Sequence, residues 1–331
     1  MNISRKFPHS RLRRNRFTSS IRNLVAENNL TVNDLIQPIF VKEGLDGSET
    51  INSLPGINRY GLNALDSELE RTQNNKINAV AVFPVIDPKK KDDKGTESLN
   101  EDNLVCKAIK QIKNNSDLTV IADVALDPYT SHGHDGLLNE SGYVDNDKSL
   151  VSLTAQAMTL AKAGADMVAP SDMMDGRIAS IRSSLEENGF VNTIILSYAA
   201  KYSSKFYGPF RDAVGSSSNL GVGSKDTYQM SPTNINEALH EVRMDLEEGA
   251  DIVMVKPGMP YLDVIKAVKE TFSVPTFAYQ VSGEYAMLKA AIQNEWLAED
   301  VLVESLLSFK RAGADCVLTY AANEIANKLN R

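Results

Sequence analysis

The chain has 331 residues, of which 42% are hydrophobic and 24% charged, and its formal net charge is −8 at pH 7. This length suffices for one large domain, and the composition is that of an ordinary globular protein. The acidic balance argues against a nucleic-acid-binding protein. Because the sequence has no apolar run of about 18 residues, we expect no membrane span.

The sequence contains two cysteines, Cys106 and Cys316. Two are too few for a disulfide framework, and one falls in a helical pattern while the other falls in an apolar strand. We therefore expect both to be buried thiols in a reducing compartment, with the cytoplasm as the location.

The N-terminal segment, residues 5–22, is rich in arginine and poor in acidic residues, as organellar transit peptides are. It contains Pro8, however, and shows no clear amphipathic helix. These features argue against a transit peptide, and the cytoplasm remains the expected location.

From residue 35 onward, apolar strands alternate with helical segments. A Gly-Ala-Asp signature stands between a helix and a strand at three places, 163–166, 248–251 and 312–315, where glycine suits a left-handed helix cap. Eight such β–α units predict a TIM (β/α)₈ barrel over residues 31–331, with its chemistry at the C-terminal ends of the strands. The expected strands are 35–41, 79–86, 119–126, 167–171, 194–199, 252–256, 276–282 and 316–321. The expected helices are 64–75, 99–114, 150–163, 177–188, 235–248, 261–271, 285–294 and 298–311.

Two of the expected strands lead directly to a lysine, Lys201 and Lys256, and each lysine has apolar, glycine and proline neighbours. A single lysine at a strand end is usually a surface charge. Two on one sheet could lie close together, and burial and mutual repulsion would favour the neutral amine that forms Schiff bases. Ser171 and Asp172 end the fourth strand at the same edge, and we interpret them as N-cap residues of the next helix.

The lysine segments resemble a known enzyme family. The stretches SYAAKYSSKFYGPFRDA (197–213), MVKPGMPYLDV (254–264), VSGEYAM (281–287) and DVALDPYTSHGHDG (123–136) are similar to porphobilinogen synthase, also called 5-aminolevulinate dehydratase. The resemblance covers nearly the whole chain. It implies a hydro-lyase that condenses two 5-aminolevulinate molecules to porphobilinogen in tetrapyrrole (haem) biosynthesis, with Schiff bases on Lys201 and Lys256.

The same resemblance implies acidic active-site residues after the third strand. These are Asp123, Asp127 and Asp135. Many family members bind a catalytic zinc there through three cysteines, whose positions are occupied here by Ala125, Asp127 and Asp135. Because zinc favours thiolate and imidazole ligands, we expect no active-site Zn²⁺. His132 and His134 in this loop could serve either in hydrogen bonds or as metal ligands.

A long polar stretch follows Lys201, and the resemblance implies that residues 203–232 form a lid over the active site. Arg211 and Lys225 in this lid match family positions that bind a substrate carboxylate, although Lys225 alone would pass for a solvated loop charge. Ser282 and Tyr320, at the ends of the seventh and eighth strands, match the pair that binds the other carboxylate. Without the resemblance, Ser282 would be a cap and Tyr320 a core residue.

The helix expected at 235–248 is acidic, which mostly indicates a solvated face. Within it, Glu241 matches the residue that binds an allosteric Mg²⁺ in part of the family, and one carboxylate with several waters is a common magnesium site. The resemblance further implies that residues 1–30 form an arm that wraps a neighbouring subunit in a homo-octamer.

Two alternatives remain at the level of sequence. One is a class I aldolase, another Schiff-base barrel enzyme, which would be expected to carry a phosphate site on its last two βα-loops. The loop after Ser282 has no glycine-rich cradle of that kind. The other is a non-catalytic binding protein that has kept the fold, for which loss of a catalytic lysine would be the signature.

Overall fold

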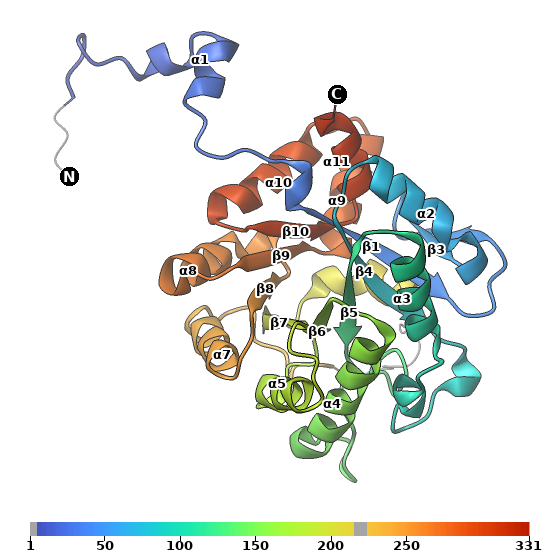
Figure 1. The fold of residues 1–331 in the computed structure, drawn as a ribbon. Helices are drawn as coiled ribbons and strands as arrows, with labels where there is room; N and C mark the ends of the chain where they lie inside the picture. The colour runs from blue at the N-terminus through green and yellow to red at the C-terminus, as the bar shows by residue number, and fades with distance from the viewer. Residues whose placement is uncertain (1–4, 215–223, 331) are drawn as a thin grey trace.

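The computed structural model describes residues 5–214 and 224–330, and its centre is the predicted TIM barrel (Figure 1). Eight parallel strands follow one another in chain order, and pairing of the last with the first closes the barrel. All eight expected strands are confirmed. They are β1 (Leu35–Lys42), β4 (Ala79–Val85), β5 (Thr119–Val124), β6 (Met167–Pro170), β7 (Ile194–Lys201), β8 (Ile252–Lys256), β9 (Thr276–Gln280) and β10 (Cys316–Thr319).

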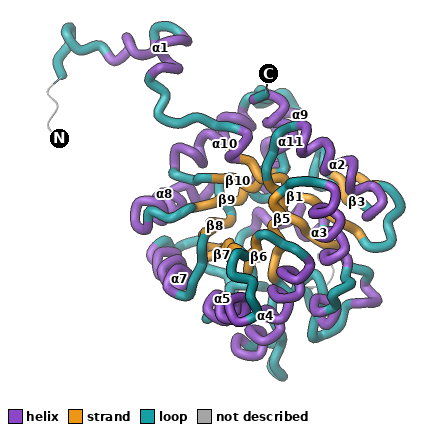
Figure 2. Tube along the Cα trace, in the orientation of Figure 1, coloured by secondary structure: helices purple, strands orange, loops and turns teal. Residues whose placement is uncertain are grey.

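The helices lie outside the strands, as Figure 2 shows, and all eight expected helices are present. They are α2 (Leu62–Asn74), α3 (Leu104–Asn115), α4 (Asn146–Ala163), α5 (Arg177–Glu187), α7 (Asn236–Glu247), α8 (Leu262–Phe272), α9 (Ser282–Gln293) and α10 (Val301–Ala312). Short features that were not predicted include the hairpin of β2 (Ser48–Thr50) and β3 (Asn58–Tyr60), α6 (Gly208–Ala213) and α11 (Ala322–Leu329). Each is too short for a clear hydrophobic period.

The three Gly-Ala-Asp signatures fasten the N-terminal end of the barrel. Their glycines adopt left-handed φ angles of 104°, 108° and 110°, which confirms the predicted helix caps. Each following aspartate, Asp166, Asp251 or Asp315, accepts a hydrogen bond of 2.7–2.8 Å from a backbone N–H near the start of the preceding strand. Each also pairs with a cation on the helix that leads into that preceding strand, namely Lys113 of α3, Arg182 of α5 and Lys269 of α8 respectively. One local motif thus ties two strands and a helix together.

Aromatic rings fill the opposite, C-terminal end of the barrel. Phe210 of α6 packs edge-on against Phe83 of β4 at 5.3 Å and lies 5.9 Å from Phe40 of β1. Phe40 also stacks on Tyr320 at 6.1 Å between ring centroids. These contacts seat α6 on the end of the barrel where the strands point their functional residues.

The N-terminal arm projects away from the barrel in Figure 1. It contains a short 3₁₀ turn (Leu12–Arg16) and the helix α1 (Ser19–Leu24). Apolar side chains on it are exposed, with Phe17 at 84% and Leu24 at 82%. Within the described ranges, no helix combines the length and the apolar character that a membrane span requires.

Candidate active site

The two predicted lysines lie side by side. Strand β7 runs to Lys201, two residues beyond its expected end, and Lys201 is the register partner of Lys256 at the end of β8. A bulge between Ser197 and Ala200 shifts the register just before this pair. Both lysines are buried, at 5% and 7% exposure.

The amine of Lys256 sits among aromatic rings. Its Nζ lies 4.8–5.4 Å from the ring centroids of Tyr198, Tyr207, Phe210 and Tyr279. Burial, with a further contribution from the charge of Lys201, lowers the pKa of Lys256 from 10.5 to about 7. Near neutral pH, a large share of this side chain is therefore the nucleophilic free amine.

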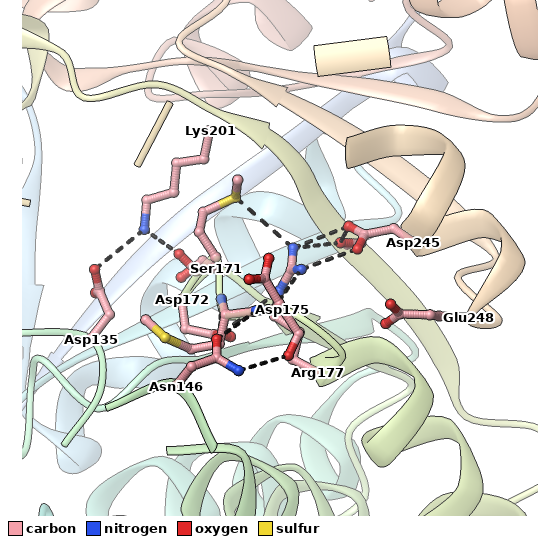
Figure 3. A network of polar contacts seen from close by, with 12 residues as sticks. Asp135, Asn146, Ser171, Asp172, Asp175, Arg177, Lys201, Asp245 and Glu248 are labelled. Carbon is pink, nitrogen blue, oxygen red and sulfur yellow. Dashed lines mark hydrogen bonds and ion pairs between the residues drawn. The ribbon is translucent and has the colours of Figure 1, made fainter. Parts of the chain in front are cut away.

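Lys201 has a more polar environment, seen in Figure 3. Its Nζ donates a hydrogen bond to the carbonyl of Ser171 and lies 3.9 Å from a carboxylate oxygen of Asp135. Our interpretation of Ser171 and Asp172 as helix N-caps is wrong, because α5 begins after Gly176. Asp172 instead accepts a hydrogen bond from the backbone of Met174, and so closes a turn beside Lys201.

The three predicted aspartates surround the lysines. Burial raises the pKa of Asp123 to about 6, despite the opposing charges of Lys256 and Lys201. Burial likewise raises the pKa of Asp127. Burial also acts on Asp135, but there the charges of Lys201 and Lys225 outweigh it and lower the pKa. The site therefore contains carboxyl groups with different proton affinities, which suits proton transfer.

Lys225 reaches this cluster from the segment predicted to be a lid. Its Nζ lies 3.1 Å from oxygens of both Asp127 and Asp135. Arg211 lines the same pocket as Lys201, Lys225 and Lys256. Residues 215–223 of the expected lid, 203–232, lie outside the described residues.

Ser282 and Tyr320 lie at the same end of the barrel, as their strand-end positions predicted. The hydroxyl of Ser282 accepts a 2.9 Å hydrogen bond from the backbone N–H of Phe210 and donates to the carbonyl of Phe206 at 3.3 Å. The hydroxyl of Tyr320 bonds that of Tyr279 at 2.8 Å. Ser282 thus holds the segment that carries Arg211, a contact that the sequence did not reveal.

Glu241 lies on α7 and lines a different pocket, together with Asn146, Asp175 and Glu237. Burial, and repulsion from nearby carboxylates, raises the pKa of Glu241 to about 7. In the described ranges, no three His, Cys, Asp or Glu side chains converge as a ready-made metal cluster. His134 is held by a 3.2 Å contact with the hydroxyl of Tyr228.

Sequence reasoning missed one buried network. Arg177 of α5 is 2% exposed and forms two hydrogen bonds of 3.0 Å to Asp245 of α7, and its Nε lies 3.8 Å from Asp172 (Figure 3). An arginine in the first turn of an amphipathic helix carries no signal that it is buried. The network connects the turn beside Lys201 with the helix that carries Glu241.

The chain is similar to known proteins of one family over nearly its whole length. A family model described as delta-aminolevulinic acid dehydratase matches residues 9–328. The delta-aminolevulinic acid dehydratase of Bradyrhizobium diazoefficiens is 53% identical over 321 residues, covering 96% of this chain and 90% of the relative. That of Methanothermus sociabilis is 51% identical, covering 98% and 100%. The crystal structure of the Toxoplasma gondii enzyme (porphobilinogen synthase) in complex with the reaction product porphobilinogen is 48% identical, covers 96% of this chain and 91% of that one, and has a TM-score of 0.94.

Proposed function

Because the chain belongs to the delta-aminolevulinic acid dehydratase family, and so is a porphobilinogen synthase of tetrapyrrole biosynthesis, we propose that Lys201 and Lys256 carry its condensation of two 5-aminolevulinate molecules. The observation that carries this assignment is their pairing, as buried register partners, at the C-terminal ends of β7 and β8. Family membership sets aside the aldolase and the non-catalytic alternatives.

The proposed chemistry begins with the free amine of Lys256. It attacks the keto carbon of one substrate molecule, and loss of the keto oxygen as water leaves a Schiff base. Lys201 forms the second Schiff base, with loss of a second water. The iminium groups draw electrons, so a neighbouring carbon loses a proton and attacks the other molecule. When the C–C and C–N bonds have formed, both lysines leave as amines, and a final deprotonation yields the pyrrole.

The acidic residues supply proton acceptors for these steps. Asp123, with its pKa raised to about 6 by burial, suits a group that takes up and returns protons near neutral pH. Asp127 and Asp135, held by Lys225, are proposed to orient the substrate's ammonium group. When a substrate carboxylate binds, Lys225 turns from the aspartates to contact it together with Arg211, which lines the same pocket. Ser282 and Tyr320 bind the carboxylate of the other molecule.

We place this chain in the branch of the family without active-site zinc. The positions that carry zinc ligands elsewhere are Ala125, Asp127 and Asp135, a set without a thiolate or an imidazole. Neither cysteine supplies a replacement, because Cys106 is buried in α3 and Cys316 begins β10 at the other end of the barrel. The residues present therefore do not fit the zinc-thiolate group.

Magnesium fits the pocket at Glu241 better. The lining residues Glu237, Asp175 and Asn146 offer only oxygen or amide groups, and hard oxygen donors with several waters are what Mg²⁺ prefers. We expect activity that survives EDTA and rises with MgCl₂ in the wild type, and no such rise in Glu241→Gln. Activity restored by zinc alone would contradict both metal assignments.

The arm and the quaternary structure complete the proposal. Exposed apolar side chains on residues 5–30, such as Phe17, support docking of the arm on another subunit in a homo-octamer. Sedimentation velocity of the full chain should give the octamer, and deletion of residues 1–30 should give smaller species. Octamers without the arm would refute this role. The lid over 203–232 and the cytoplasmic location stay predictions.

Borohydride trapping tests the catalytic assignment directly. Incubation with 5-aminolevulinate and borohydride should place reduced adducts on Lys201 and Lys256, identified by peptide mass mapping. Lys256→Ala should abolish porphobilinogen formation. Near-normal turnover in that variant would overturn the assignment.

A further inference from the structure

Glu284, in the first turn of α9, is completely buried, at 0% exposure. Its hydrogen-bond partners among the described residues are all backbone N–H groups. One carboxylate oxygen accepts from Gly258 at 3.1 Å and from Met259 at 2.9 Å, and the other accepts from Val281 at 2.7 Å. Burial raises the pKa of Glu284 to about 8, against the effect of these three donors.

The bond to Val281 is an ordinary helix cap, since a glutamate at the third helical position often reaches back to the N-cap backbone. The bonds to Gly258 and Met259 are different, because they cross from α9 to the turn that follows β8. One side chain therefore joins the end of the Lys256 strand to the first turn of the helix that carries Ser282.

Glu284 supplies the side-chain acceptor for the turn from 256 to 259. Pro257 has no N–H to donate, so Gly258 and Met259 provide the first donors after Lys256. Gly258 is packed so closely that a Cβ there would lie 2.1 Å from the Phe309 ring. On its other side, the carbonyl of Lys256 accepts from the backbone N–H of Tyr202 at 2.9 Å. Hydrogen bonds thus hold the backbone around Lys256 on both sides, from Glu284 and from Tyr202.

We propose that Glu284 is a positioning residue for the condensation, holding the 256–259 turn against the start of α9 so that Lys256 and Ser282 stay at a set separation. A carboxyl group buried without a cation is an expensive group to keep, and its two oxygens accept hydrogen bonds from three backbone donors on two elements. The proposal rests on the function proposed above for Lys256. Its effect runs through geometry, since Glu284 contacts backbone rather than the reacting groups.

Two variants separate this role from helix capping. Glu284→Asp keeps the carboxyl group and can still cap α9, but its side chain is shorter by about 1.5 Å and no longer reaches Gly258 and Met259. Glu284→Gln keeps the length and replaces one acceptor oxygen by a donor, which cannot bond a backbone N–H. Asp315→Asn is the control, because Asp315 also accepts from a strand backbone N–H, but at the N-terminal end of β9.

The readout is the rate of borohydride-trapped adduct formation at each lysine, measured by peptide mapping with 5-aminolevulinate, alongside the melting temperature. We expect the rate of adduct formation at Lys256 to fall roughly tenfold or more in both Glu284 variants, as it does when a reacting group is misplaced. The rate at Lys201 should stay within about twofold of wild type. Asp315→Asn should keep both rates while it loses thermal stability.

Unchanged labelling of Lys256 in Glu284→Asp would overturn the proposal, and so would an equal fall at both lysines. If the wild type itself forms no adduct at Lys256, the proposed function fails and the role of Glu284 falls with it. Full labelling of the wild type with full labelling of the variants refutes only the positioning role.

Discussion

The sharpest prediction concerns the stability of Lys256→Met. Methionine is close in length to lysine and keeps an apolar stem among Tyr198, Tyr207, Phe210 and Tyr279, but it carries no amine. If burial of the amine serves catalysis alone, its removal should abolish turnover and stabilise the fold.

The size of the effect follows from the pKa. Burial lowers the pKa of Lys256 from 10.5 to about 7. At pH 7 Lys256 is fully protonated in the unfolded chain and only partly protonated in the folded chain. This difference lowers the free energy of unfolding of the wild type by roughly 4 kcal/mol. Between pH 7 and 10.5 the unfolded state binds more protons, so the stability of the wild type rises with pH. By pH 9.5 the difference in free energy of unfolding between Lys256→Met and the wild type should therefore fall to about 1 kcal/mol.

The assay is urea unfolding at one protein concentration, at pH 7 and pH 9.5, with porphobilinogen formation measured in parallel. Lys266→Met is the matched control, because that side chain is 61% exposed and should change neither quantity. Lys256→Met that is no more stable than the wild type at pH 7, or a difference in free energy of unfolding that stays constant with pH, would contradict this prediction.

Three further predictions address the site and the fold. The rate of adduct formation at Lys256 should rise about tenfold per pH unit below its pKa of about 7 and level off above it, because the free amine reacts; a flat profile from pH 5 to 9 would contradict this. Arg177→Met should lower the free energy of unfolding by roughly 3–5 kcal/mol, because it leaves the charge of Asp245 buried without a cation; urea unfolding that gives a value within about 1 kcal/mol of wild type would refute this. Asp166→Asn should lose roughly 1–2 kcal/mol by weakening the tie to β5 while specific activity is retained, and loss of activity in a folded variant would argue against a purely structural role.

Local patterns were enough for most of the architecture. Apolar runs of four to eight residues and helical periods depend on near neighbours in the chain, so all eight strands and the eight long helices of the barrel were predicted. Gly164, Gly249 and Gly313 marked helix ends because few other residues adopt left-handed backbone at so little cost. The long motifs around Lys201 and Lys256 identified the family, which the comparisons confirm.

The contacts within the site depend on closure of the barrel, because closure brings together residues that lie far apart in the sequence. It makes Lys201 and Lys256 register partners although they are far apart in sequence, and it brings Lys225 to Asp127 and Asp135. The sequence placed both lysines at strand ends, but the pKa of Lys256 is lowered by its burial among rings that come from three other segments. In the same way, the helix expected at 285–294 left Glu284 outside it. The bonds of Glu284 to the turn after Lys256 exist only because β8 and α9 meet at the end of the barrel. Proton affinities and positioning contacts depend on burial and on distant partners, and only the tertiary structure supplies these.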